Sequence, residues 1–304
     1  MVLKEAMKEV WIKGVRGKHW RLIYKLNSNN ILTPVTALGK CEPISVKEMI
    51  KQGSVLGSVI SSITIDSLTR MMNESGKAWE IEGIKMNPLL FQDDIFAVNR
   101  TKDIQETINI IETFQNLKRL QFHEEKSKKS ILNGKRNEKV KVNGIEIERV
   151  TSHTYLGKII EEKIKDKEEI QERLKKAKAQ TTQSFVVIDR KKLNRKRIEV
   201  GIKLLQTVVI PTLTTGAETW TKLTEKEKHD INSIQTQYLT RLLKIPRTTP
   251  RSALLTETGL MKVEHIANQR KLEYYIDLNN REKWRLEAKM KKLQEQKNMS
   301  YKKK

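Results

Sequence analysis

The chain has 304 residues and a formal net charge of +23, because its 60 lysines and arginines outnumber its 37 aspartates and glutamates. A positive field of this size attracts polyanions such as nucleic acids, although a solvated lysine-rich surface would have the same composition. The single cysteine, Cys41, excludes an internal disulfide, and no apolar run has the length of a membrane-spanning helix, so we expect an intracellular protein, cytoplasmic or nuclear, with no membrane partner.

The first half of the chain mixes helical and strand signals. Hydrophobic spacing and glycine breaks predict helices at residues 3–12, 18–26 and 58–72, and a hairpin within residues 34–50 that turns near Gly39. A further helix is expected at residues 102–120. Its buried face would consist of Ile104, Ile108, Ile111, Phe114 and Leu117. Asn143-Gly144, between two segments of period two, predicts a two-residue hairpin.

The second half has the pattern of long, charged helices. Residues 163–179 are rich in lysine and glutamate at i,i+4 spacing, and residues 195–209 are more apolar. Thr224 and Glu227 form a capping-box pattern before a helix whose buried face would include Tyr238. Another short helix is expected between Pro250 and Gly259.

Two adjacent carboxylates, Asp93 and Asp94, interrupt the otherwise apolar segment MNPLLFQDDIFAV at residues 86–98. Neighbouring carboxylates repel each other, and burying them is costly unless a cation binds them. We therefore expect two buried strands, residues 89–92 and 95–98, with both aspartates at the hairpin tip, facing a divalent cation. An ordinary exposed Asp-Asp turn is the alternative, because aspartate is a common turn residue.

Other segments accompany this one in a fixed order: KQGSVLGSVISSI at 51–63, HEEKSKKSIL at 123–132, TYLGKII at 154–160, VVIPTLTTGAETW at 208–220 and a helical segment at 231–260. Together they resemble the palm and thumb of reverse transcriptases from LINE-type (non-LTR) retrotransposons. The resemblance extends to about Tyr275. It implies an α+β fold: a partial palm with an antiparallel sheet and packed helices at 1–160, an all-α thumb-like region at 161–260, and a basic helical tail at 261–304.

The resemblance implies an RNA-directed DNA polymerase that uses an RNA template, a DNA primer and deoxynucleoside triphosphates. Two Mg²⁺ ions, or Mn²⁺, would serve nucleotidyl transfer to the primer 3′-hydroxyl. Asp93 would be the main metal ligand in this hairpin and Asp94 an auxiliary one. Phe91 occupies the position of the family's aromatic residue, and Gln92 replaces a smaller residue.

Further roles follow from the same resemblance. Gln52 and Gly53 would contact the nucleotide and template, and Lys126 would assist the leaving pyrophosphate. Tyr155, Leu156 and Gly157 would brace the primer end. Each segment also has a purely structural interpretation, as a loop-to-helix junction, a solvated basic loop and palm core respectively.

A dense basic cluster near the thumb is expected to contact nucleic-acid phosphates rather than bases. It consists of Arg190, Lys191, Lys192, Arg195, Lys196 and Arg197.

The sequence departs from the family in one important respect. The family's palm has a further metal-binding aspartate on an earlier strand, and residues 1–50 contain no aspartate. We therefore expect a truncated family member that does not extend a primer by itself. The alternative function is a catalytically dead, basic nucleic-acid-binding remnant.

Overall fold

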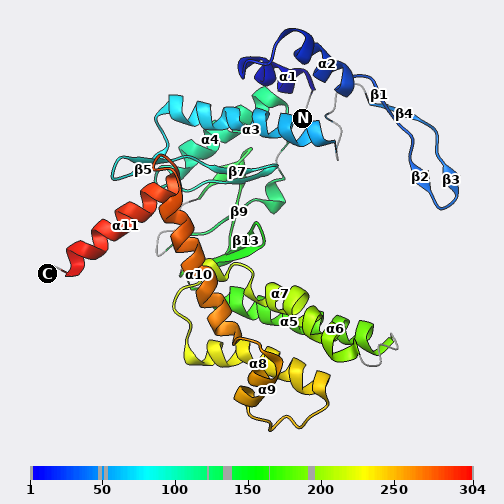
Figure 1. Ribbon diagram of the computed structural model, residues 1–304. Helices are drawn as coiled ribbons and strands as arrows, with labels where there is room; N and C mark the ends of the chain where they lie inside the picture. Colours follow the sequence, from blue (N-terminus) through cyan, green and yellow to red (C-terminus); the bar gives the residue numbers. More distant parts are fainter. Residues whose placement is uncertain are drawn as a thin grey trace. The chain divides into compact units, whose positions relative to one another are not determined.

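The structure is a computed structural model that describes residues 3–46, 50, 54–121, 123–132, 139–163, 165–190 and 196–302. Its contacts divide the chain into two units, Met1–Val150 and Thr151–Lys304. In Figure 1 the first unit extends from blue to green and the second from green to red. The first mixes helices with short strand pairs and the second is mostly helical, a mixed helix-and-strand structure compatible with the expected α+β class.

The first unit begins with two helices, α1 (Leu3–Ile12) and α2 (Gly17–Asn27), and two longer helices follow, α3 (Val55–Ser75) and α4 (Ile104–Lys118). All four were predicted within a few residues. The strands between and after them are β1 (Asn30–Leu32), β2 (Val35–Thr36), β3 (Gly39–Lys40), β4 (Ile44–Val46), β5 (Trp79–Ile81), β6 (Ile84–Met86), β7 (Leu89–Phe91), β8 (Asp94–Phe96), β9 (Lys128–Lys129), β10 (Lys141–Val142), β11 (Ile145–Glu146) and β12 (Glu148–Arg149).

The expected palm sheet is not formed by the described residues. Every strand there has one partner, so the pairs are separate two-stranded ladders, and β9 pairs with β12 in parallel. The strands are two to four residues long, too short to bury a broad face. The predicted hairpins at Gly39 and at Asn143-Gly144 are confirmed as β2–β3 and β10–β11.

Helices supply most of the core of the first unit. Leu3, Met7 and Val10 of α1 pack with Ile60 of α3. Farther along, Leu68 and Met72 of α3 pack with the α4 residues Ile111 and Phe114. The predicted α4 face is thus confirmed at Ile111 and Phe114 and wrong at Leu117, which is exposed.

A buried carboxylate links three helices of the first unit. Glu9 of α1 accepts hydrogen bonds from Lys118 Nζ at 2.5 Å and from Arg70 at 2.7 Å. Burial would raise the pKa of Glu9, but the hydrogen bonds and charges of Lys118 and Arg70 outweigh it and lower that pKa below its ordinary value. The ion pairs therefore hold α1 against α3 and α4.

The second unit begins with the hairpin β13 (Ser152–Tyr155) and β14 (Lys158–Glu161). The helical elements that follow are α5 (Lys167–Arg190), α6 (Arg197–Leu204), the π-helical turn η3 (Leu205–Val209), α7 (Ile210–Thr214), the 3₁₀ turn η4 (Ala217–Thr219), α8 (Glu225–Leu243), α9 (Arg251–Thr258), α10 (Val263–Asn280) and α11 (Leu286–Lys302). The predicted capping box at Thr224 and Glu227 is confirmed, and Gly259 ends α9 with a left-handed φ of 64°.

One large core holds this unit together, and Phe185, Leu213, Tyr238 and Leu239 lie at its centre. Burial raises the pKa of Tyr238 to about 12, and its hydroxyl donates to Gly201 O at 2.8 Å. Arg197–Thr219 is apolar and long enough for a membrane span by length and composition. Its residues Leu205, Val209 and Leu213 are nevertheless buried in this core.

Candidate functional site

Asp93 and Asp94 lie in the β-hairpin β7–β8 of the first unit. Phe91 pairs with Asp94, so Gln92 and Asp93 form the turn, and Gln92 adopts a left-handed φ of 53°. This corrects the expected strands 89–92 and 95–98: the turn lies one residue earlier, and Asp94 begins β8. Only Asp93 is at the tip.

The hairpin is also more exposed than expected. Both aspartates are open to solvent, and Phe91 is 53% exposed rather than part of the core. The predicted buried strands are therefore wrong. Because water solvates both carboxylates, their placement carries no burial cost that a bound cation would have to offset.

One side of the hairpin is nevertheless anchored. Leu90 of β7 and Ile95 of β8 pack on the cluster formed by Leu68, Met72 and Phe114 of α3 and α4. Alternation along a strand then directs Phe91 and Asp94 away from this cluster. The hairpin thus presents its carboxylates to solvent from a helical support.

Neither carboxylate has a basic partner among the residues that the structure describes: no ion pair or side-chain hydrogen bond there involves Asp93 or Asp94. This contrasts with Glu5, Glu9 and Asp66 of the same unit, which all pair with lysine or arginine. Carboxylate oxygens are ligands that Mg²⁺ and Mn²⁺ accept, so the donor chemistry fits a divalent cation. Within the described ranges, no group of three or more His, Cys, Asp or Glu gathers for a metal ion.

Of the remaining predicted palm residues in the first unit, the structure describes Lys126 but not Gln52 and Gly53. Lys126 is exposed in the 3₁₀ turn η1 (Glu124–Lys126), and no described hydrogen bond or ion pair joins it to Asp93 or Asp94. Gln52 and Gly53 lie outside the described residues.

Tyr155, Leu156 and Gly157 belong to the second unit, where they form the end of the hairpin β13–β14. Tyr155 pairs with Lys158, and the turn residues Leu156 and Gly157 have φ values of 47° and 79°. The segment is therefore a tight turn rather than a continuous strand. Left-handed φ at both central positions is typical of a type I′ hairpin turn.

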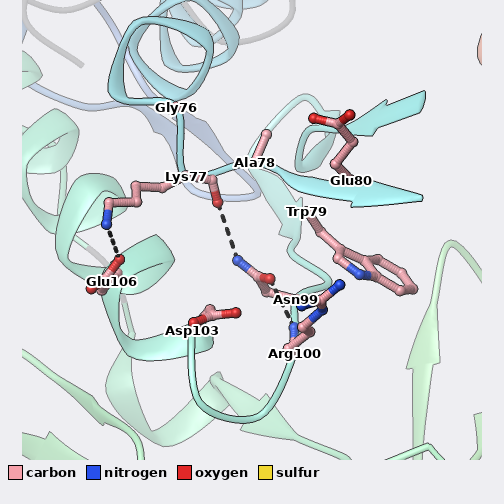
Figure 2. Close-up of a pocket in the computed structure, with 9 residues that line it drawn as sticks. All are labelled: Gly76, Lys77, Ala78, Trp79, Glu80, Asn99, Arg100, Asp103 and Glu106. Carbon is pink, nitrogen blue, oxygen red and sulfur yellow. Dashed lines mark hydrogen bonds and ion pairs between the residues drawn. The ribbon is translucent and has the colours of Figure 1, made fainter. Parts of the chain in front are cut away.

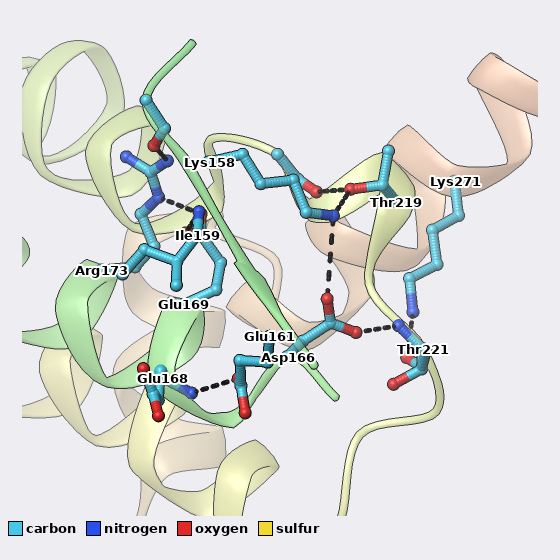
Figure 3. A network of polar contacts seen from close by, with 12 residues as sticks. Lys158, Ile159, Glu161, Asp166, Glu168, Glu169, Arg173, Thr219, Thr221 and Lys271 are labelled. Atoms are coloured by element: carbon cyan, nitrogen blue, oxygen red, sulfur yellow. Dashed lines mark hydrogen bonds and ion pairs between the residues drawn. The ribbon is translucent and has the colours of Figure 1, made fainter. Parts of the chain in front are cut away.

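A buried ion pair fixes this turn to α5, as Figure 3 shows. Arg173 donates from Nε to Glu169 Oε1 at 2.7 Å and from Nη2 to Gly157 O at 2.6 Å. The second oxygen of Glu169 accepts from Ile159 N at 2.8 Å. The sequence did not single out this pair, because the whole segment 163–179 is rich in charged residues at i,i+4 spacing.

A second set of contacts in Figure 3 ties the same hairpin to the loops around η4. Lys158 contacts the Thr219 hydroxyl and lies 3.7 Å from Asp166 Oδ1. Asp166 Oδ2 accepts from Thr221 N at 2.6 Å, and Lys271 donates to Thr221 O at 3.0 Å. Burial lowers the pKa of Lys271.

The predicted basic cluster is described only in part. Lys191, Lys192 and Arg195 lie outside the described residues, and Arg190 ends α5. Lys196 is exposed. Arg197 donates to Leu242 O at 2.9 Å and to Asp189 Oδ1 at 3.0 Å, so it stabilises the helical unit.

Among the residues that the structure describes, two hollows of the first unit have the lining of a possible binding site. The smaller, about 290 Å³, is shown in Figure 2 and has a polar lining. Within it Lys77 pairs with Glu106 at 2.7 Å, and Asn99 donates to Lys77 O at 3.2 Å. Lys77, Glu106 and Asn99 thus use their polar groups on contacts within the hollow.

The larger hollow, about 710 Å³, lies between α1 and α2. Trp11, Trp20 and Tyr24 line it together with Met7, Ile12 and two lysines, Lys4 and Lys8. Sequence analysis missed this cleft. The sequence pattern that could have indicated the cleft is the pair Trp20 and Tyr24, four residues apart on α2, together with Trp11 near the end of the preceding helix.

No protein-family model matches the chain, and no curated protein matches it either.

Proposed function

We propose that this chain is the palm and thumb portion of a reverse transcriptase of the non-LTR retrotransposon type, an RNA-directed DNA polymerase. The observation that carries the proposal is the hairpin β7–β8, which presents Asp93 and Asp94 to solvent without a basic partner in the described part of a chain of net charge +23. The order of the sequence motifs around this hairpin supports the same proposal.

In this proposal Asp93 and Asp94 would hold a divalent cation, Mg²⁺ or Mn²⁺. When bound, the cation would neutralise negative charge on the phosphates of an incoming deoxynucleoside triphosphate. The chain itself supplies rigidity, because Leu90 and Ile95 fix the hairpin to α3 and α4. Phe91, exposed beside Asp94, offers a flat apolar surface next to the carboxylates.

The helical unit would hold the template and primer in this proposal. Glu169 and Arg173 anchor the hairpin that carries the Tyr155-Leu156-Gly157 turn through hydrogen bonds to Ile159 N and Gly157 O. Exposed lysines on the chain supply the attraction for phosphates.

A second candidate is a basic nucleic-acid-binding protein without turnover. The +23 charge favours it, because charge alone confers affinity for the phosphate backbone. The two candidates differ in whether Asp93 and Asp94 bind metal.

Thermal melting with and without Mn²⁺ tests the proposal. The variant Asp93→Asn/Asp94→Asn relieves carboxylate repulsion and is expected to be at least as stable as the wild type without metal. Mn²⁺ is expected to raise the melting temperature of the wild type, because a ligand that binds only the folded state stabilises it. The Asn variant is expected to gain less or nothing.

A matched control is the variant Glu124→Gln/Glu125→Gln, which removes another adjacent carboxylate pair of the same unit. Glu124 accepts from Asn143 at 2.8 Å, and a glutamine oxygen can still accept that bond. This variant is expected to retain the full response to Mn²⁺. An identical metal response in all three proteins would reject the cation site.

A further inference from the structure

The aromatic cleft between α1 and α2 has no role in the proposed polymerase site. Its floor is apolar, formed by Met7 and the rings of Trp11, Trp20 and Tyr24, and Lys4 and Lys8 stand at its edge. Trp11 is 44% exposed and Tyr24 is 40% exposed. Two large aromatic rings are thus open to solvent in one concave place.

The rings are held in a defined arrangement. Trp20 and Tyr24 stack with centroids 5.4 Å apart and an interplanar angle of 3°, and Trp11 meets Trp20 edge to face at 6.1 Å. The Trp20 indole N–H donates to Met7 O at 2.9 Å, which fixes the ring to α1. Little conformational freedom therefore remains to be lost when a flat ligand packs on them.

The surroundings of the cleft are positive. Helix α2 has three exposed cations, Lys18, Arg21 and Lys25, and contains no acidic residue. On α1, the carboxylate of Glu5 pairs with Lys8 at 3.0 Å, and Glu9 is buried against Lys118. No described ion pair engages Lys4, and Arg16 lies 4.7 Å from the Trp11 ring centroid.

An occupant should therefore combine a flat aromatic surface with negative charge. Unpaired nucleotides have both, since a base stacks on aromatic side chains and its phosphates attract lysines. A duplex keeps its bases stacked inside and cannot offer them without being opened. An uncharged apolar peptide would leave the lysines without partners.

We propose that the α1–α2 cleft binds single-stranded nucleic acid by stacking bases on Trp11 and Tyr24, with Lys4 and the α2 cations contacting phosphates. This inference deepens the proposed nucleic-acid function and rests on it. It concerns a surface separate in sequence from the Asp93-Asp94 hairpin.

The test measures fluorescence anisotropy of labelled oligodeoxythymidylate, about 20 nucleotides long, and of an abasic oligonucleotide with the same number of phosphates. The full chain is expected to bind the thymidylate strand about tenfold more tightly than the abasic strand. The variant Trp11→Ala/Tyr24→Ala is expected to lose this preference and to bind both strands alike. Trp20 stays unchanged because its hydrogen bond to Met7 supports the fold.

The variant Trp284→Ala is the matched control, since Trp284 is 68% exposed and lies beside Arg285 in the other unit. It is expected to keep the preference for the thymidylate strand. Equal binding of both strands by the unaltered chain would overturn the inference and leave the proposed function intact, and this comparison needs no variant. If the chain bound neither strand, both the inference and the proposed function would be overturned. If Trp284→Ala lost the preference for the thymidylate strand as fully as Trp11→Ala/Tyr24→Ala, base stacking at this cleft would be overturned.

Discussion

Arg173 and Glu169 form a buried ion pair one helical turn apart on α5, with Nε and Oε1 separated by 2.7 Å. The pair bonds to the backbone of the β13–β14 hairpin at two points, Gly157 O in the turn and Ile159 N in β14. Two charges removed from water are stable only when their remaining hydrogen-bonding capacity is also used. Here the hairpin backbone supplies those bonds, so helix and hairpin depend on each other.

We expect Glu169→Gln to lower the free energy of unfolding by about 3 kcal/mol, because it leaves the buried guanidinium of Arg173 without a counter-charge. Urea unfolding followed by circular dichroism measures this. Glu172→Gln is the control, since Glu172 pairs with Lys176 at the surface at 3.5 Å and its loss should cost about 0.5 kcal/mol or less. Equal losses in the two variants would contradict the role assigned to Glu169.

Glu9 makes the stability of the first unit depend on pH. Its pKa in the folded chain lies below its ordinary value of 4.5, so the folded state releases this proton more readily than the unfolded state. The resulting stability is fully present above pH 4.5 and is lost as the pH falls through the lowered pKa. We expect the stability difference between the wild type and Glu9→Gln to be constant near neutrality and to shrink in acid.

The measurement is the free energy of unfolding at successive pH values for both proteins. Glu5→Gln serves as the reference, because Glu5 pairs with the more exposed Lys8. A difference that grows as the pH falls would show that the sign assigned to the Glu9 shift is incorrect.

Gly201 allows α6 and α8 to approach closely. A Cβ at this position would lie 2.8 Å from Leu242 Cδ2 and 3.1 Å from its Cγ, and Leu242 is itself buried. Alanine gains about 1 kcal/mol in helix propensity, but overpacking a filled core costs about 1–3 kcal/mol. We expect Gly201→Ala to be destabilising by about 1 kcal/mol.

The companion variant Gly201→Ala/Leu242→Val removes the clashing methylene. In thermal or urea unfolding, the double variant should lose less unfolding free energy than the summed losses of Gly201→Ala and Leu242→Val. If the two losses in unfolding free energy were strictly additive, the side chains at positions 201 and 242 would not be in contact.

Nucleic-acid binding by the whole chain should depend strongly on salt. Because the attraction comes from phosphate neutralisation, affinity for a duplex is expected to fall by about tenfold or more between about 50 mM and about 200 mM salt. Changing Arg190, Lys191, Lys192, Arg195, Lys196 and Arg197 to glutamine should weaken binding and flatten this dependence. Arg197 also supports the helical unit, so the same set with Arg197 retained is the cleaner variant. Binding unaffected by salt would exclude a phosphate-based interface.

The features that the sequence predicts correctly are those set by neighbouring residues in the chain. Asn143-Gly144 and the Thr224–Glu227 capping box depend on short-range backbone chemistry, and both are confirmed. The Asp-Asp hairpin was placed one residue late, because nothing in its sequence marks Gln92 as the left-handed turn residue.

Tertiary packing explains what the sequence does not reveal. Leu117 continues the helical period but is 57% exposed, whereas Lys118 beside it is buried and Leu120 packs on the core beyond the helix end. Glu169 and Arg173 look like a surface pair until the β13–β14 hairpin covers them. The cleft of Trp11, Trp20 and Tyr24 forms only when α1 and α2 pack together.

The proposed cation site at Asp93 and Asp94 can be mapped by cleavage with Fe²⁺ substituted for Mg²⁺, in the presence of an RNA template annealed to a DNA primer. Iron(II) bound at carboxylates reduces added hydrogen peroxide to hydroxide and a hydroxyl radical, becoming iron(III), and the radical cuts whatever lies close to the iron. We expect cuts in the protein near Asp93 and in the primer near its 3′ end, both absent in Asp93→Asn/Asp94→Asn. Uniform cleavage along the primer, or protein cuts near Asp93 that persist in this variant, would contradict the claim that the β7–β8 hairpin is the cation site of a polymerase palm.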